Sequence, residues 1–215
     1  MTVEKTFASA IQNHQKNNFK AAEDLYNQIL EIDPNHIKTI FFLGTLSVQT
    51  KNFDRAKQML QKTIQAQPNN VDAYNNLGVV FKEFEEFQKA RDCFEKVIQI
   101  QPKHVDALNN LGNVFKQLNE PQKAINYYQK AIEIEPSYIN AHQNLMDVCE
   151  KTNQITELKD AVSNARTFFK DNSIIKLYEG ILFSRNEKFV EAKNCLELIL
   201  FETKEIKNEI LRVST

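Results

Sequence analysis

The chain has 215 residues and a formal net charge of −1, with 27 basic and 28 acidic side chains spread along its length. No basic stripe is present, which excludes a nucleic-acid backbone as the expected partner. The apolar content of 42% is enough for a core, but no apolar run approaches the roughly 18 residues of a membrane span. The N-terminus also lacks the apolar segment of a signal peptide.

The three cysteines, Cys93, Cys149 and Cys195, lie in apolar helical contexts and are not paired at the spacing of a metal site. We interpret them as buried, reduced thiols. This interpretation favours a cytoplasmic protein, and we expect no metal or other cofactor.

Glycine, proline and alanine mark a repeat of 34 residues. The four glycines are separated by 34, 34 and 68 residues, and four of the five prolines are 34 residues apart. Alanine recurs at a third phase of the same period. The markers are Gly44, Gly78, Gly112 and Gly180; Pro34, Pro68, Pro102 and Pro136; and Ala22, Ala56, Ala90, Ala124 and Ala192. The pattern predicts an array of structural repeats.

Each repeat is predicted to contain two amphipathic helices. In residues 71–104, apolar side chains recur at helical spacing on both sides of a turn near Glu86. The proline ends the second helix, because the residue before a proline is disfavoured in the α region. A glycine in mid-helix costs about 1 kcal/mol relative to alanine. We therefore expect Gly78 to allow close approach of the second helix at the recurring Ala90.

Six repeats account for most of the chain. Residues 207–215 begin the first helix of a seventh and then stop, without the polar capping helix that usually finishes such an array. We therefore expect the chain to be a truncated part of a longer protein. The six repeats are residues 3–36, 37–70, 71–104, 105–138, 139–172 and 173–206.

Two central repeats carry a family resemblance. The pattern Tyr74-x-x-Leu77-Gly78-x-x-Phe81, followed by Ala90, Phe94, Val97 and Pro102, resembles the tetratricopeptide repeat. A fuller match is Leu108-x-x-Leu111-Gly112-x-x-Phe115, followed by Ala124, Tyr128, Ala131 and Pro136. The resemblance extends over residues 3 to about 206. It implies an all-α, right-handed α-solenoid of about six helix-turn-helix repeats, in which the first helices line a concave groove.

The fifth repeat is degenerate. Met146 stands where the repeat has glycine, Leu158 where it has alanine, and Lys170 where it has proline. The larger Leu158 is expected to push the two helices of this repeat apart and to change the local superhelical pitch.

No catalytic constellation is predicted, so we do not expect an enzyme. His36 and His104 each follow a proline by two residues and are interpreted as structural residues between repeats. His14 and His142 lie on first helices without a Cys, His or carboxylate partner at metal-ligand spacing. All four glycines belong to the repeat, which leaves no glycine-rich phosphate loop.

Asparagines recur on the side of the first helices that the resemblance places in the groove. A carboxamide offers one acceptor and two donor hydrogens, so a row of them can bind the N–H and C=O groups of an extended peptide. Position 6 of successive repeats carries Asn76, Asn110 and Asn144, position 5 carries Asn75 and Asn109, and position 9 carries Asn113.

This row resembles the asparagine ladder of the O-linked N-acetylglucosamine transferase repeats, and residues 110–113 read NLGN as that ladder does. The alternative is that these asparagines merely fill tolerated surface positions. A chaperone C-terminal tail is not the expected ligand. The dicarboxylate clamp for such tails needs lysine at position 5, and none of the six repeats has it.

The terminal repeats are apolar at the same nominal groove positions, with Phe7, Phe41 and Phe42 at one end and Leu177 and Tyr178 at the other. Exposed apolar patches usually mark contacts. Self-association, contact with a following domain and anchoring of a peptide are alternatives, as is simple capping of the first repeat by Phe7.

Three functions fit these observations. The first is a protein–protein interaction scaffold whose groove binds an extended peptide through the asparagine row. The second is the substrate-presenting region of a larger transferase encoded beyond residue 215, since bacterial fusions of such repeats to transferase domains look similar. The third is a structural array that forms homo-oligomers through its terminal apolar residues.

Overall fold

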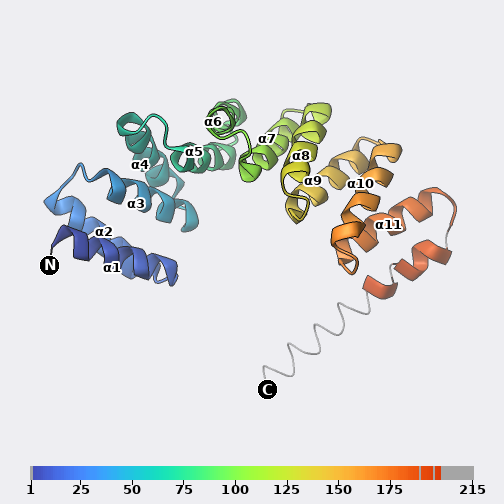
Figure 1. Cartoon of the computed structure of the whole chain (residues 1–215), viewed down its shortest axis with the longest axis horizontal. Helices are drawn as coiled ribbons and strands as arrows, with labels where there is room; N and C mark the ends of the chain where they lie inside the picture. Colours follow the sequence, from blue (N-terminus) through green and yellow to red (C-terminus); the bar gives the residue numbers. More distant parts are fainter. Residues whose placement is uncertain (1, 189, 196, 200–215) are drawn as a thin grey trace, which may run out of the picture. The chain divides into compact units, whose positions relative to one another are not determined.

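The computed structural model describes residues 2–188, 190–195 and 197–199, which form α-helices and turns and contain no β-strand (Figure 1). The expectation of an all-α fold built from consecutive helix pairs is confirmed. The helices with defined bounds are α1 (Val3–Gln15), α2 (Phe19–Ile32), α3 (Ile37–Gln49), α4 (Phe53–Ala66), α5 (Val71–Glu83), α6 (Phe87–Ile100), α7 (Val105–Gln117), α8 (Pro121–Ile134), α9 (Ile139–Lys151), α10 (Ile155–Phe168) and α11 (Ser173–Arg185).

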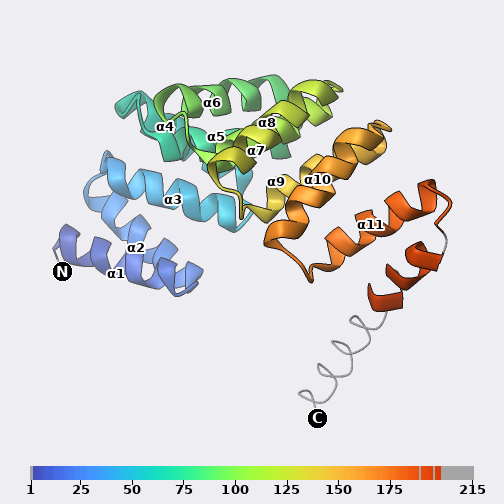
Figure 2. The same cartoon turned by 45° about the vertical axis from the view of Figure 1, so that its right-hand side comes forward.

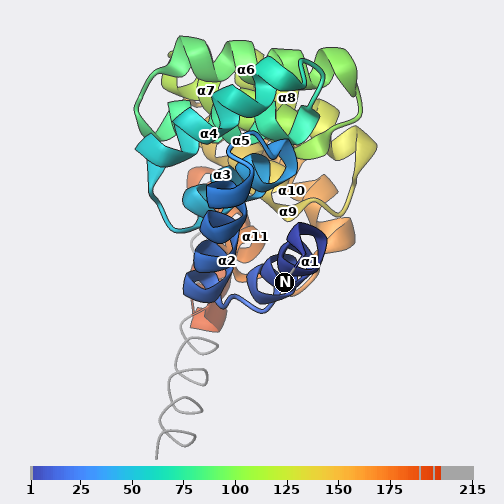
Figure 3. The same ribbon diagram turned by 90° about the vertical axis from the view of Figure 1, so that its left-hand side faces the viewer.

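The chain divides into an N-terminal body, residues 1–118, and a C-terminal body, residues 119–215. In the N-terminal body, α1 packs on α2, α3 on α4 and α5 on α6, and each second helix also contacts the next first helix (Figure 3). The first helices α3, α5 and α7 contact one another in sequence. In the C-terminal body, α9 packs between α8 and α10, and α11 contacts both α9 and α10 (Figure 2).

Side-chain caps set the starts of several first helices. The Asn70 carboxamide oxygen accepts a hydrogen bond from the Ala73 amide at 2.9 Å. His36 and His104 occupy the equivalent position and use Nδ1 as the acceptor, at 3.3 Å from the Thr39 amide and 3.2 Å from the Ala107 amide. These bonds satisfy amides that lack a partner within the helix. The two histidines are therefore structural, as their position after the proline predicts.

The turn after each first helix uses a left-handed residue that is not glycine. Asn17, Lys51 and Glu85 have φ values of 60°, 59° and 59°, and the equivalent residues of the C-terminal body have φ between 57° and 58°. The following amide closes the turn. Asn18 N–H, for example, donates to Asn13 O at 2.9 Å, which is the Schellman pattern of helix ends. Lysine and glutamate occupy this position in some repeats and asparagine in others. The left-handed conformation is therefore not evident from the residue type.

The mid-helix glycines permit close approach of large side chains. A Cβ atom on Gly78 would lie 2.6 Å from Cε1 of Phe94, and one on Gly44 would lie 3.2 Å from Leu60. The sequence places this close approach at Ala90, and the contact at Ala90 stays a prediction. The nearest atoms belong to the aromatic ring one turn further along α6.

The fifth repeat accommodates its departures by looser pairing. Met146 and Leu158, which replace the glycine and the alanine, are both fully buried. Helices α9 and α10 still pack together, but less closely along their length than α3 and α4. The sparser contact between α9 and α10 agrees with the expected effect of Leu158, and the change of superhelical pitch stays a prediction.

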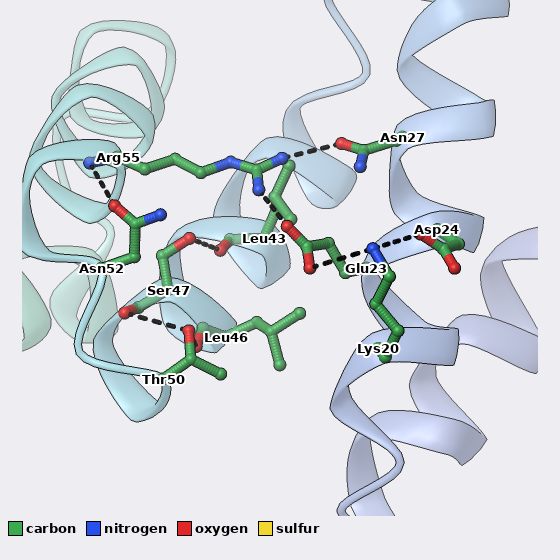
Figure 4. A network of polar contacts seen from close by, with 10 residues as sticks. All are labelled: Lys20, Glu23, Asp24, Asn27, Leu43, Leu46, Ser47, Thr50, Asn52 and Arg55. Carbon is green, nitrogen blue, oxygen red and sulfur yellow. Dashed lines mark hydrogen bonds and ion pairs between the residues drawn. The ribbon is translucent and has the colours of Figure 1, made fainter.

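A polar network joins two neighbouring second helices of the N-terminal body (Figure 4). The Arg55 guanidinium of α4 bonds to the Glu23 carboxylate of α2 and donates to Asn27 Oδ1 at 2.7 Å. Lys20 extends the network along α2, 3.0 Å from Asp24. Arg55 and Glu23 are partly exposed, so their pair contributes at most about 1 kcal/mol to stability. Lys20 is exposed to solvent.

Two expectations concern residues at the end of the chain. Residues 200–206 of the sixth repeat and residues 207–215, the expected start of a seventh, lie outside the described residues. Within the described part, none of the helices has the length and hydropathy needed to cross a membrane.

Gly78→Ala is expected to lower the free energy of unfolding by about 1–3 kcal/mol. Alanine is the better helix former, but its Cβ would overlap the fully buried ring of Phe94. Gly180→Ala is the matched control, because its nearest neighbour, Cys195 Cβ, is 3.4 Å away, an ordinary contact. Helix propensity should then raise stability by up to about 1 kcal/mol. Urea unfolding followed by circular dichroism measures the free energy of unfolding of both variants. Equal changes in the two variants would contradict the expected overlap with the Phe94 ring.

Candidate functional site

A groove lies between the first helices α1 and α3 of the N-terminal body. It encloses about 340 Å³, within the range of small ligand sites, roughly 300–1,000 Å³. Ile11 and Phe42 give it an apolar wall, and the remaining lining is polar. The lining residues are Ile11, His14, Gln15, Asn17, Phe42, Thr45 and Gln49. All but Asn17 occupy positions 6, 9, 12 or 13 of their repeats, which are nominal groove positions.

Hydrogen bonds hold the His14 ring in this groove. Nε2 lies 2.8 Å from Gln49 Oε1 and therefore donates, while Nδ1 lies 3.2 Å from the Tyr26 hydroxyl and accepts from it. Burial raises the pKa of Tyr26 to about 12, so the phenol keeps its proton and remains a donor. His14 is thus a fixed wall of the groove that links α1 to α3.

Asn76 and Asn110 continue this face on α5 and α7. Asn76 Nδ2 donates to Thr45 Oγ1 on α3 at 3.1 Å. At the position equivalent to Thr45, the helix before Asn110 carries Val79, which has no hydrogen-bonding side chain. Asn110 is half-buried, and its carboxamide makes no hydrogen bond among the described residues. The two amides therefore differ: one is partly used within the protein, and the other is available.

The other predicted asparagines have different surroundings. Asn109 is only 6% exposed, so its burial removes it from the candidate contacts. Asn75 is half-buried, and its Oδ1 is buried without a hydrogen-bond partner among the described residues. Asn113 is half-buried and lines a separate cavity of about 360 Å³ with Lys82 and Lys116. Asn144 is half-buried on α9, in the C-terminal body.

The N-terminal aromatic residues pack together and remain partly exposed. The Phe7 ring centroid is 5.6 Å from those of Phe42 and His36, and Phe41 lies 5.2 Å from Phe42. Phe7 and Phe42 pack on the core of the first two repeats, beside the fully buried Tyr26. The contact role of these aromatic residues stays a prediction, and the alternative that Phe7 caps the first repeat also fits the contacts.

The apolar residues near the other end are more accessible. Leu177 is 41% exposed, whereas Tyr178 is half-buried. Burial raises the pKa of Tyr178 to about 12. Leu177 therefore remains a candidate contact residue, while much of Tyr178 packs within the C-terminal body.

The described residues offer little reactive chemistry. They contain no group of three or more His, Cys, Asp or Glu side chains placed to hold a metal ion. Cys93, Cys149 and Cys195 are free thiols, and Cys195 is only half-buried. Burial raises the pKa of Cys93 to about 12 and that of Cys149 to about 11. These thiols therefore lack the thiolate character of a nucleophile at neutral pH.

His142 is a fully buried polar residue that sequence reasoning did not single out as such. Its Nε2 lies 2.9 Å from the Pro136 carbonyl oxygen and donates to it, while Nδ1 is buried without a partner among the described residues. Burial lowers the pKa of the imidazole, which favours its neutral form. The ring centroids of Phe168 and Phe169 lie 6.2 Å and 5.6 Å from the centroid of the His142 ring.

Two protein-family models match the chain, and both describe the same repeat. The tetratricopeptide repeat model matches residues 71–104 and 105–138, and a second model with the same description matches residues 14–78. Together the matches extend from residue 14 to residue 138, more than half of the chain. A comparison with curated proteins gives no match.

Solved structures share the fold. The crystal structure of MamA is 26% identical, with a TM-score of 0.71 over 78% of this chain and 92% of that chain. PilF of Pseudomonas aeruginosa is 17% identical, with a TM-score of 0.77 over 99% and 97%. YrrB, described as a tetratricopeptide repeat protein with an unusual peptide-binding site, is 18% identical, with a TM-score of 0.65 over 81% and 90%. The last two similarities establish the fold alone.

His142 should make stability fall in mild acid. Its pKa is lowered on folding, so below the unfolded value of about 6.5 the unfolded chain binds the extra proton. Relative to His142→Leu, the wild type should lose stability between pH 7.5 and pH 5.5, by at most about 1.4 kcal/mol per pH unit. Urea unfolding across this range measures the difference. A difference that is independent of pH would refute the assignment.

Proposed function

The chain belongs to the tetratricopeptide repeat family and is a protein-interaction scaffold, and on this premise we propose that its first helices bind an extended peptide segment. The candidate surface runs along α1, α3, α5 and α7 of the N-terminal body. We further propose that the repeat array comprises residues 3–206, and that Asn144 offers the same amide chemistry in the C-terminal body.

The observation that carries the proposal is the Asn110 carboxamide. It is half-buried on a first helix, and no hydrogen bond within the described residues uses it. Its carboxamide atoms are not among the buried polar atoms without a partner, so they remain open to solvent. A ligand can therefore bond to them without displacing a protein partner. A peptide main chain does so without regard to its side chains, because each residue presents one N–H and one C=O.

Asn76 extends the same chemistry to the neighbouring helix. One of its amide hydrogens is directed at Thr45, which fixes the orientation of the carboxamide. Its other hydrogen and its oxygen remain available for a main chain. An oriented amide loses less conformational freedom on binding than a free one, so this bond contributes to preorganisation.

The α1–α3 groove gives the peptide an anchor. Ile11 and Phe42 supply apolar surface, while Thr45 borders the groove and also holds Asn76. One apolar side chain of the peptide would enter the groove as its main chain continues toward α5 and α7. Amide contacts then give affinity that is largely independent of sequence, and the groove selects one side chain.

The double variant Asn76→Ala/Asn110→Ala tests the proposal. An array of extended twelve-residue peptides identifies ligands of the wild-type chain, and titration calorimetry measures their affinity for each variant. Two lost hydrogen bonds of about 1 kcal/mol each should weaken binding by roughly 10- to 30-fold.

Gln65→Ala is the matched control, because Gln65 is an exposed carboxamide on the second helix α4. It should bind peptide as the wild type does. Circular dichroism establishes that each variant remains folded. Equal affinity of the wild type and the double variant would remove the asparagines from the binding surface.

A further inference from the structure

A second surface of different chemistry lies in the C-terminal body, among α8, α9 and α10. It is a cavity of about 360 Å³. Ile132, Leu145 and Ala161 are buried and give it an apolar lining. Two of the three helices, α8 and α10, are second helices of their repeats, so this surface is separate from the asparagine row.

Three carboxylates border this cavity without a cation to balance them. Glu133 of α8 and Glu157 and Asp160 of α10 are exposed and line the cavity, and none forms an ion pair or a side-chain hydrogen bond within the described residues. Charge repulsion among like groups is unfavourable, and a bound cation relieves it.

Four basic side chains of the same body serve other partners. Lys151 lies 2.8 Å from Asp147, Arg166 lies 3.1 Å from Glu179, and Arg185 lies 2.9 Å from Glu150. Lys130 is placed over the ring of Tyr127, 5.3 Å from its centroid. These four cations are engaged elsewhere and form no ion pair with the three carboxylates.

His142 provides an independent observation. Its fully buried ring lines the cavity, and its Nε2–H donates to the Pro136 carbonyl oxygen. The remaining nitrogen, Nδ1, is then a hydrogen-bond acceptor, and it is buried with no donor among the described residues. The cavity thus combines three acidic groups with a buried acceptor, and both features call for a ligand rich in donors.

We propose that this cavity binds an arginine side chain of a basic segment of a partner protein. The apolar lining suits the aliphatic stem of arginine, and the carboxylates suit its guanidinium, which has five N–H donors and no acceptor. Charge complementarity favours this occupant. The proposal does not rest on the peptide-binding function of the first helices, because the two surfaces share no residue.

The test uses the whole chain, labelled with ¹⁵N, and the peptide acetyl-Gly-Gly-Arg-Gly-Gly-amide in the millimolar range expected for a single side chain. Chemical-shift changes should be confined to α8, α9 and α10 and should include the ring nitrogens of His142. The triple variant Glu133→Gln/Glu157→Gln/Asp160→Asn should weaken binding at least about tenfold, because charge-assisted bonds are lost.

Two controls separate this site from general attraction between charges. Glu31→Gln/Asp54→Asn/Glu95→Gln removes the same charge from α2, α4 and α6 and should leave the affinity within about twofold. The same peptide with neutral citrulline in place of arginine should not bind. Equal loss in the two triple variants, equal binding of the citrulline peptide, or an absence of shifts in α8–α10 would each overturn the proposal.

Discussion

Burial of each helix pair against the next is the constraint on which the rest of this structure depends. Two amphipathic helices of 13 and 14 residues, such as α5 and α6, cannot cover their apolar stripes alone. The contact between Gly78 and the Phe94 ring lets the two helices of one repeat approach closely. The second helix then completes its burial against the following first helix, as α6 does against α7.

This packing divides each first helix into two faces with different freedom. Residues such as Leu77 and Leu111 are buried and are required by the neighbouring helix. Residues such as Asn76 and Asn110 lie at the margin of that contact, where a change of side chain leaves the apolar core intact. Function can therefore vary on this margin without loss of the fold, which is why fold alone does not specify a partner.

The degenerate fifth repeat shows how far the packing tolerates change. Met146 and Leu158 stand where other repeats have glycine and alanine, and both are fully buried. The larger side chains are accommodated within the core, because interiors accept a substitution where voids and overlap are avoided. The cavity with the unpaired carboxylates lies beside this repeat, so looser pairing of α9 and α10 coincides with a surface of distinct chemistry.

The sequence by itself determined the helices, their 34-residue period and the prolines that follow several second helices, because these features follow from the local spacing of apolar, glycine and proline residues. It also indicated that asparagines lie outside the core. Only the tertiary structure decided that Asn76 bonds to Thr45, that Asn109 is buried, and that Phe7 packs on Phe42. It also brought Glu133 and Asp160, which are 27 residues apart in the chain, to the lining of one cavity. The physical reason is register: period specifies which face a residue occupies, whereas its contacts depend on how neighbouring helices slide and rotate against one another.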